Sequence, residues 1–323
     1  MKQILMARGA RTLVDTCTNV KSNEKVVIVT DMTKVAIAEA VATAAYERGA
    51  EVVMTVMEPR KRAGQEPPEP VAAAMKTADV IFSPVSFSIT HTQAVKDAVS
   101  GGARAIVMTD FTEEMMMGGG IEANFQEIKP ICQGVARAFS EGSKVHVVTP
   151  GGTDLWLNAS GRRGNSLYCV VEPGQFSTVP TIEANFSPVE DSAEGTIVCD
   201  ASIPYLGIGI INEPLKITVK KGYITEISGG GSQGERLRRN LAEQNDHNAY
   251  NIAELGVGLN PKCRMCGIML EDEGVKSTAH IGIGTSITLG GVRKAPMHYD
   301  LIMWHPTITV DDKIIVDKEE VYI

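Results

Sequence analysis

The first half of the chain alternates short apolar runs with longer helical segments, and this alternation constrains the fold most. Apolar runs of the buried-strand type occur at residues 26–30, 51–57, 80–83, 104–108 and 145–148, with helical segments between them at 33–48, 71–77, 92–99 and 121–140. Strands that alternate with helices predict a parallel sheet covered on both faces. We therefore expect an α/β fold whose N-terminal domain, residues 1–150, is a doubly wound parallel sheet.

The pattern changes at Pro150, Gly151 and Gly152. The segments that follow are shorter and are broken by Gly, Pro and Asn, which is typical of antiparallel structure. Hairpins are predicted where strand patterns flank Lys221-Gly222 and Asp311-Asp312, and a charged helix is predicted over 234–244. We expect residues 151–323 to form a second, mixed and largely antiparallel α+β domain.

Four polar side chains interrupt or end apolar or glycine-rich runs between residues 251 and 300. They are Glu254, His280, His298 and Asp300. A carboxylate or imidazole is costly to bury unless a partner compensates it. Together these residue types suit zinc, manganese, cobalt or iron, so the stretch predicts a metal site. On a strand, His298 and Asp300 would share one face. The alternative is a His–Asp hydrogen bond without a metal.

Two residues outside that stretch are further candidates. Glu183 is the only charged residue between Glu172 and Glu190. His91 follows the third predicted strand, and ligands of parallel sheets bind beyond the carboxyl ends of the strands. We expect an acid/base or substrate-binding role for His91, or else a solvent-facing residue at a helix start. No GxGxxG or Walker sequence is present, so no nucleotide cofactor is expected.

Composition narrows the classes of partner. The net charge is −8 without a basic tract, which argues against nucleic acid and an anionic membrane surface. No apolar run approaches the ~20 residues that span a bilayer. The first ten residues lack the pattern of a signal peptide, and the six cysteines are scattered, so we expect a cytoplasmic protein. Cys263 and Cys266 form a lone CxxC, which favours a structural role over a metal or redox site.

The candidate ligands carry a resemblance to the aminopeptidase T/aminopeptidase S family of metallopeptidases. The family's motifs match Glu183 with Pro188, Glu254, His280 with Gly284, and the His-x-Asp of His298 and Asp300. The resemblance implies a two-metal site with Glu183, Glu254, His280, His298 and Asp300 as ligands, and a homodimer or higher assembly. It departs at the family's catalytic Tyr, because that position is Ile287 here.

The chain also resembles the mononuclear-iron 2,5-dihydroxypyridine 5,6-dioxygenases. That resemblance rests on segments 190–196, 259–261 and 290–296. It implies iron ligands that include His298 and Asp300, with a His at the position of Glu254. His91 lies near a His that acts in proton transfer in those enzymes.

Three hypotheses follow. The favoured one is a hydrolase of an amide-like bond in a small molecule or peptide. One or two Zn, Co or Mn ions would lower the pKa of bound water towards ~7, with Glu254 as general base and His91 as proton donor. The second is an Fe(II) ring-cleaving dioxygenase of a hydroxylated N-heteroaromatic compound, with His280, His298 and Asp300 as ligands. The third is a non-enzymatic binding protein whose carboxylates and histidines merely pair.

Overall fold

The computed structural model describes all 323 residues. Its contacts divide the chain into two compact units, Met1–Gln126 with Tyr168–Pro180 (unit 1) and Glu127–Leu167 with Thr181–Ile323 (unit 2). The predicted boundary at residue 150 thus lies inside unit 2. Helix α6 (Phe125–Glu141) brings Phe139 against Phe186 of unit 2, with ring centroids 4.8 Å apart, and strand β5 (Lys144–Val148) pairs with a C-terminal strand.

Unit 1 is built on a five-stranded sheet, sheet A, in which every neighbouring pair of strands is parallel. The strand order is β2 (Glu51–Met57), β1 (Lys25–Asp31), β3 (Val80–Val85), β4 (Arg104–Thr109) and β8 (Phe176–Thr178). The first four strands lie at the predicted apolar runs. The α/β fold class, with a parallel N-terminal sheet, is confirmed.

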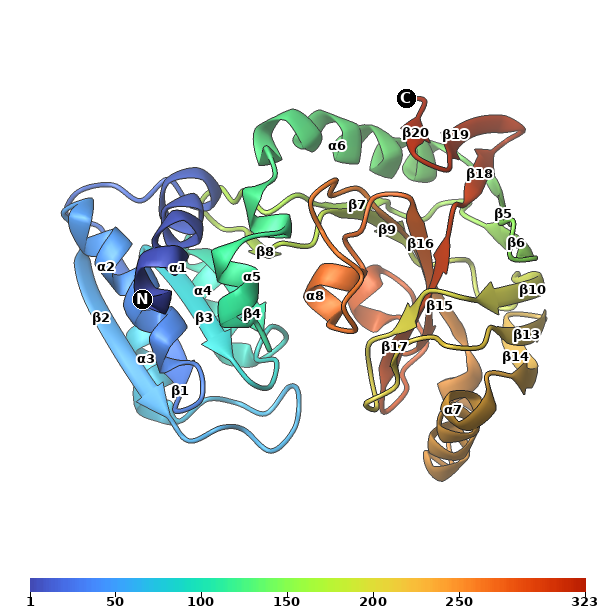
Figure 1. Cartoon of the computed structure of the whole chain (residues 1–323), viewed down its shortest axis with the longest axis horizontal. Helices are drawn as coiled ribbons and strands as arrows, with labels where there is room; N and C mark the ends of the chain where they lie inside the picture. Colours follow the sequence, from blue (N-terminus) through green and yellow to red (C-terminus); the bar gives the residue numbers. More distant parts are fainter. The chain divides into compact units, whose positions relative to one another are not determined.

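Helices connect the parallel strands of sheet A (Figure 1). The connection from β1 to β2 runs in the opposite direction to those from β2 to β3 and from β3 to β4, so right-handed crossovers place its helix on the other face. The α-helices of unit 1 are α1 (Lys2–Arg11), α2 (Val35–Glu47), α3 (Glu69–Lys76), α4 (Gln93–Ser100) and α5 (Glu113–Met117). Residues of the helices in the second and third connections, α3 and α4, form a buried core with Val27, Val29 and Ile81.

One predicted strand of the parallel sheet belongs elsewhere. We expected residues 145–148 to be its fifth strand, but β5 pairs antiparallel with β6 (Asp154–Asn158) and with β18 (Thr307–Val310) in unit 2. The fifth strand of sheet A is the short β8 instead. An apolar run identifies a buried strand but does not identify its neighbours.

Unit 2 contains an eight-stranded antiparallel sheet, sheet B. Two of its hairpins were predicted, and in both the turn residues have positive φ, as a type I′ turn requires: Lys221 (47°) with Gly222 (75°), and Asp311 (47°) with Asp312 (66°). Its strands are, in order, β14 (Tyr223–Gly229), β13 (Leu215–Lys220), β10 (Glu194–Cys199), β6, β5, β18, β19 (Lys313–Asp317) and β20 (Glu320–Val321).

The second sheet of unit 2, sheet C, has seven antiparallel strands and carries the predicted ligands. Its order is β12 (Gly209–Ile210), β11 (Ser202–Ile203), β17 (His298–Trp304), β16 (Thr278–Gly284), β15 (Ile252–Gly258), β9 (Glu183–Phe186) and β7 (Asn165–Leu167). All residues of β15 and β16 are buried. Helices α7 (Gly231–Glu243) and α8 (Met269–Asp272) lie between these strands in the chain.

No helix of the structure combines the length and the apolar composition needed to cross a membrane.

Candidate metal centre

His298 and Asp300 begin strand β17, and their side chains meet. His298 Nε2 lies 3.3 Å from Asp300 Oδ1. Alternation along a strand places residues i and i+2 on one face, which is the arrangement that the His-x-Asp spacing predicts. The intervening Tyr299 donates from its hydroxyl to Asn240 Oδ1 in α7, at 3.1 Å.

Strand register brings Glu254 to the same place. Gly282 of β16 is paired with Glu254 on one side and with Asp300 on the other, so the three residues form one row across the sheet. His298 Nε2 lies 3.0 Å from Glu254 Oε2. The ligand atoms of Glu254, His298 and Asp300 all lie within 4.8 Å of one another, which is close enough to hold one metal ion.

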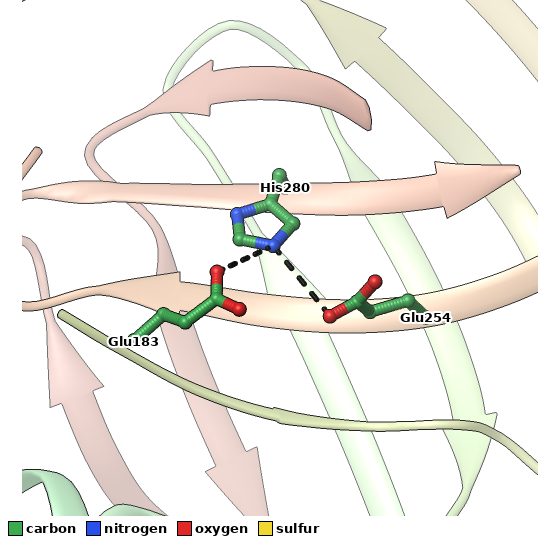
Figure 2. A group of neighbouring side chains, drawn as sticks. All are labelled: Glu183, Glu254 and His280. Carbon is green, nitrogen blue, oxygen red and sulfur yellow. Dashed lines mark ion pairs between the residues drawn. The ribbon is translucent and has the colours of Figure 1, made fainter. Parts of the chain in front are cut away.

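His280 and Glu183 complete a second group that shares Glu254 (Figure 2). His280 Nε2 lies 3.3 Å from Glu183 Oε2 and 3.8 Å from Glu254 Oε1. The residues come from the neighbouring strands β9, β15 and β16. The structure therefore joins all five predicted ligand residues through Glu254. The expected iron triad differs, because His280 groups with Glu183 and Glu254 rather than with His298 and Asp300.

Two glycines make room for these side chains. A Cβ on Gly256 would lie 2.0 Å from His280 Nε2. A Cβ on Gly282 would lie 2.7 Å from His298 Nε2 and 2.8 Å from Glu254 Cβ. Real Cβ atoms do not approach other atoms so closely, so any larger residue would displace a candidate ligand. The glycine-rich character of β15 and β16 is thus part of the site.

Burial and charge perturb Glu183 and His280 in particular. Glu183 is 5% exposed and His280 is 1% exposed. Burial, reinforced by the charges of Glu254 and Asp300, raises the pKa of Glu183 to about 7. Burial alone would lower the pKa of His280, but the nearby carboxylates of Glu254 and Glu183 raise it to about 9. In the protein without metal, the carboxylates therefore hold His280 as a cation.

The other three residues are also perturbed. Burial opposes each shift but does not decide it. The charge of Asp300, together with the hydrogen bond to Glu254 and its charge, raises the pKa of His298 well above its usual range. The charge of His298 lowers the pKa of Asp300. The contact with His280 and the hydrogen bond from His298 lower the pKa of Glu254. Without a metal, the protonated imidazoles therefore supply the positive charge that these carboxylates require. A metal ion would take the place of the imidazole protons, because metal ligands must be deprotonated.

The donor set fits a divalent metal ion. Glu183 Oε2 and Asp300 Oδ1 are buried, lie in the cluster and make no hydrogen bond. Buried polar atoms without a hydrogen-bond partner are uncommon, and each calls for an explanation such as an ion. Three carboxylates with two imidazoles give a mixed oxygen and nitrogen set of the kind that zinc, manganese or iron accept.

Surrounding residues orient the candidate ligands. His298 Nδ1 lies 2.8 Å from the backbone oxygen of Thr285. A carbonyl oxygen only accepts, so Nδ1 carries a hydrogen and Nε2 faces the carboxylates. Asn185 Nδ2 donates to Glu183 Oε1 at 2.9 Å.

Sequence reasoning missed two polar neighbours of Asp300. The Tyr205 hydroxyl lies 2.8 Å from Asp300 Oδ2 and 3.0 Å from Glu273 Oε1. Glu273 is buried, and its burial together with the charge of Asp300 raises its pKa well above the usual range. The sequence signal that could have found Glu273 is the run of three acids Glu271, Asp272 and Glu273. In the structure all three are buried. Nothing in the local sequence singled out Tyr205.

The remaining predicted residues lie elsewhere. His91 is exposed, in unit 1, directly before Thr92, which caps helix α4. Its acid/base role stays a prediction.

Ile287, at the position of the peptidase Tyr, is 50% exposed in the short 3₁₀ helix Ile287–Leu289. In the CxxC segment, Cys263 is buried and Cys266 exposed, and Asp272 accepts hydrogen bonds from the backbone of Cys266 and Gly267.

Comparison with known proteins decides between the two resemblances. The family model described as 2,5-dihydroxypyridine 5,6-dioxygenase matches residues 10–322. The chain belongs to this family. A 2,5-dihydroxypyridine 5,6-dioxygenase of Pseudomonas putida is 32% identical over 157 residues, so the match spans 45% of this chain and 44% of that enzyme.

Two solved structures share the fold. The 2,5-dihydroxypyridine dioxygenase of Pseudomonas putida superposes with a TM-score of 0.83 at 20% identity, over 99% of this chain and 97% of that one. AmpT of Thermus thermophilus superposes with a TM-score of 0.70 at 14% identity, over 100% of both chains. At these identities the likeness shows the fold alone.

The favoured hypothesis of a metallohydrolase is wrong. The family match over nearly the whole chain points to oxygen chemistry, and the likeness to AmpT extends only to the fold. The role of Glu254 as general base was predicted for that hydrolytic reaction, so it is not proposed further. The misjudgement has a physical origin: a set of carboxylates and imidazoles serves hydrolytic zinc and oxidative iron alike.

Proposed function

We propose that the chain is a mononuclear iron(II) dioxygenase that cleaves the ring of a dihydroxylated pyridine or a closely related N-heteroaromatic compound. The observation that carries the proposal is the family match over residues 10–322. The group of Glu254, His298 and Asp300 supports it, because its ligand atoms lie within 4.8 Å of one another.

Glu254, His298 and Asp300 would hold the iron, with Glu183 and His280 beside it. The usual non-haem iron oxygenase site has two histidines and one carboxylate on one side of the metal, leaving positions open. Here Glu254 makes the group richer in carboxylate. A bound iron(II) would supply the activation of dioxygen and a position for a ring hydroxyl of the substrate.

The protein's own part is to orient the ligands and to keep the site dry. The Thr285 carbonyl fixes the ring of His298. Asn185 holds one oxygen of Glu183, and the flanking glycines leave the space that the side chains fill. In the overall reaction one carbon–carbon bond of the ring breaks and both atoms of one O₂ enter the product, so no external reductant is needed.

The decisive experiment uses the full chain, purified anaerobically without a histidine tag and loaded with Fe(II). It is mixed with 2,5-dihydroxypyridine and ¹⁸O₂. We expect one O₂ consumed per ring lost, and two ¹⁸O atoms in the product by mass spectrometry. The His298→Ala protein, treated identically, is expected to do neither.

A catechol, which has adjacent hydroxyls and no ring nitrogen, serves as the comparison substrate. If the protein consumes oxygen with the catechol but not with 2,5-dihydroxypyridine, the proposed substrate class of pyridines is wrong. Loss of the ring without oxygen uptake, or product oxygen drawn only from water, would refute the dioxygenase.

A further inference from the structure

We propose that Tyr205 is a positioning residue of the metal centre, which fixes the Asp300 carboxylate so that only one of its oxygens faces the metal. The inference rests on the metal site within the proposed function. It does not depend on which substrate is oxidised.

The two oxygens of Asp300 have different surroundings. Oδ2 accepts a hydrogen bond from the Tyr205 hydroxyl at 2.8 Å. Oδ1 is buried, makes no hydrogen bond, and lies 3.3 Å from His298 Nε2. A carboxylate with one oxygen engaged by a phenol presents the other to a cation. The geometry thus makes Asp300 a ligand through Oδ1.

No neighbouring strand offers a side chain that could hydrogen-bond to Asp300 Oδ2 in place of Tyr205. On one side its partner is Gly282, which has none. On the other side β11 pairs with β17 only where Ser202 meets Ile302, two residues beyond Asp300. Tyr205 follows Ser202 by three residues, so the chain leaving β11 delivers the phenol to this unpaired flank.

The Tyr205 segment is itself anchored, so the hydroxyl is held in place. Ser202 Oγ donates to Asp272 Oδ2 at 2.5 Å. Arg236 Nη1 donates to the backbone oxygens of Leu206 at 3.1 Å and Gly207 at 3.0 Å. The Tyr205 ring lies beside the Tyr299 ring, with centroids 5.2 Å apart. Contacts on both sides of Tyr205 therefore order it before any metal binds.

The test compares Tyr205→Phe with Tyr299→Phe. Both substitutions remove one phenol oxygen from the same pair of packed rings, but the Tyr299 hydroxyl contacts Asn240 in α7 and not the cluster. Metal-free protein is titrated with Co(II) alone and followed by visible absorption, which reports both affinity and coordination geometry.

We expect Tyr205→Phe to weaken Co(II) binding by about 10- to 100-fold, as is typical for loss of an outer-shell partner. The cobalt spectrum at saturation should also change, because the phenol then no longer engages Asp300 Oδ2. Tyr299→Phe should keep the wild-type affinity and spectrum. Circular dichroism of the metal-free variants checks the fold, and the saturated spectrum reports only on folded, loaded molecules.

Wild-type affinity and spectrum in Tyr205→Phe would overturn the proposal, as would equal losses in both variants. A wild-type protein that binds no Co(II) would overturn it too. If instead wild type binds Co(II) and Tyr205→Phe shows the expected loss, but the iron-loaded enzyme consumes no oxygen, the proposed function fails and this inference stands.

Discussion

His298 shows at the scale of one residue how the site works. Nδ1 is committed to the Thr285 carbonyl, and Nε2 reaches both Glu254 and Asp300. An imidazole held in this way offers its second nitrogen in a fixed direction, which is how metal-binding histidines are usually presented. No other residue of the group contacts two candidate carboxylate ligands and a backbone carbonyl at once.

Replacing His298 with Ala should reduce Fe(II) binding below detection, because the one imidazole among the three ligands is lost. Metal content after anaerobic dialysis against Fe(II) measures this. His146→Ala is the matched control, since His146 pairs with Asp154 and stacks on Trp156 in sheet B. Retained iron in His298→Ala would exclude His298 as a ligand.

His280 makes the stability of the metal-free protein depend on pH. Its pKa in the folded protein is about 9, above the ordinary value of 6.5. The folded state therefore holds this proton more tightly, and the resulting stability is fully present below pH 6.5 and is lost as pH rises through 9. Glu183, with a pKa of about 7, acts in the same direction at lower pH.

The melting temperature of the metal-free protein should accordingly fall between pH 6.5 and 9, by calorimetry in the presence of a chelator. His280→Gln should show a shallower fall. A melting temperature that rises over this range would contradict the assignment. With saturating metal the dependence should weaken or reverse, because metal binding requires deprotonated ligands.

At the scale of elements, the site depends on three adjacent strands in one register. The row from Glu254 through Gly282 to Asp300 runs across β15, β16 and β17. A shift of one residue in any strand would turn its ligand to the opposite face. The pairing of β16 with β17 over seven residues opposes such a slip.

Gly282→Ala tests the space in this row. The new Cβ would lie 2.7 Å from His298 Nε2 and 2.8 Å from Glu254 Cβ, so at least one ligand must move. We expect metal affinity to fall on the order of 10- to 100-fold, as when an outer-shell partner is lost. Gly118→Ala is the control, because its nearest neighbour is a flexible Glu122 oxygen at 3.4 Å. Equal cobalt affinities in the two variants would show that the cluster tolerates the added methyl group.

At the scale of the whole molecule, the two units are not consecutive halves of the chain. Residues Glu127–Leu167 belong with the C-terminal unit, and β5 lies in the interior of sheet B between β6 and β18. Removing an interior strand leaves both neighbours with unpaired backbone groups.

A fragment of residues 151–323 should therefore fail to fold cooperatively. A fragment of residues 127–323 in which a short glycine-rich linker replaces 168–180 should fold, because Leu167 and Glu183 are paired across β7 and β9. Circular dichroism melts of the two fragments measure this. A cooperative transition in the shorter fragment would show that β5 is dispensable.

Local periodicity was sufficient for much of the structure. The first four strands of sheet A, the two hairpins and the shared face of His298 and Asp300 follow from alternation and turn chemistry, which neighbouring residues decide. Residue chemistry also selected four of the five polar residues that meet in sheet C, and the resemblance to the metallopeptidases added Glu183 as a ligand.

Tertiary structure alone decided which segments became neighbours. It assigned β5 to sheet B, placed Glu254 rather than His280 beside His298 and Asp300, and brought Tyr205 to Asp300. In the cluster these contacts join residues 44 to 95 positions apart. Where β5 pairs with β18, Val147 meets Ile308, which is 161 positions further along the chain. A periodic pattern reports which face a residue occupies, but pairing between distant strands depends on the packing of the whole sheet.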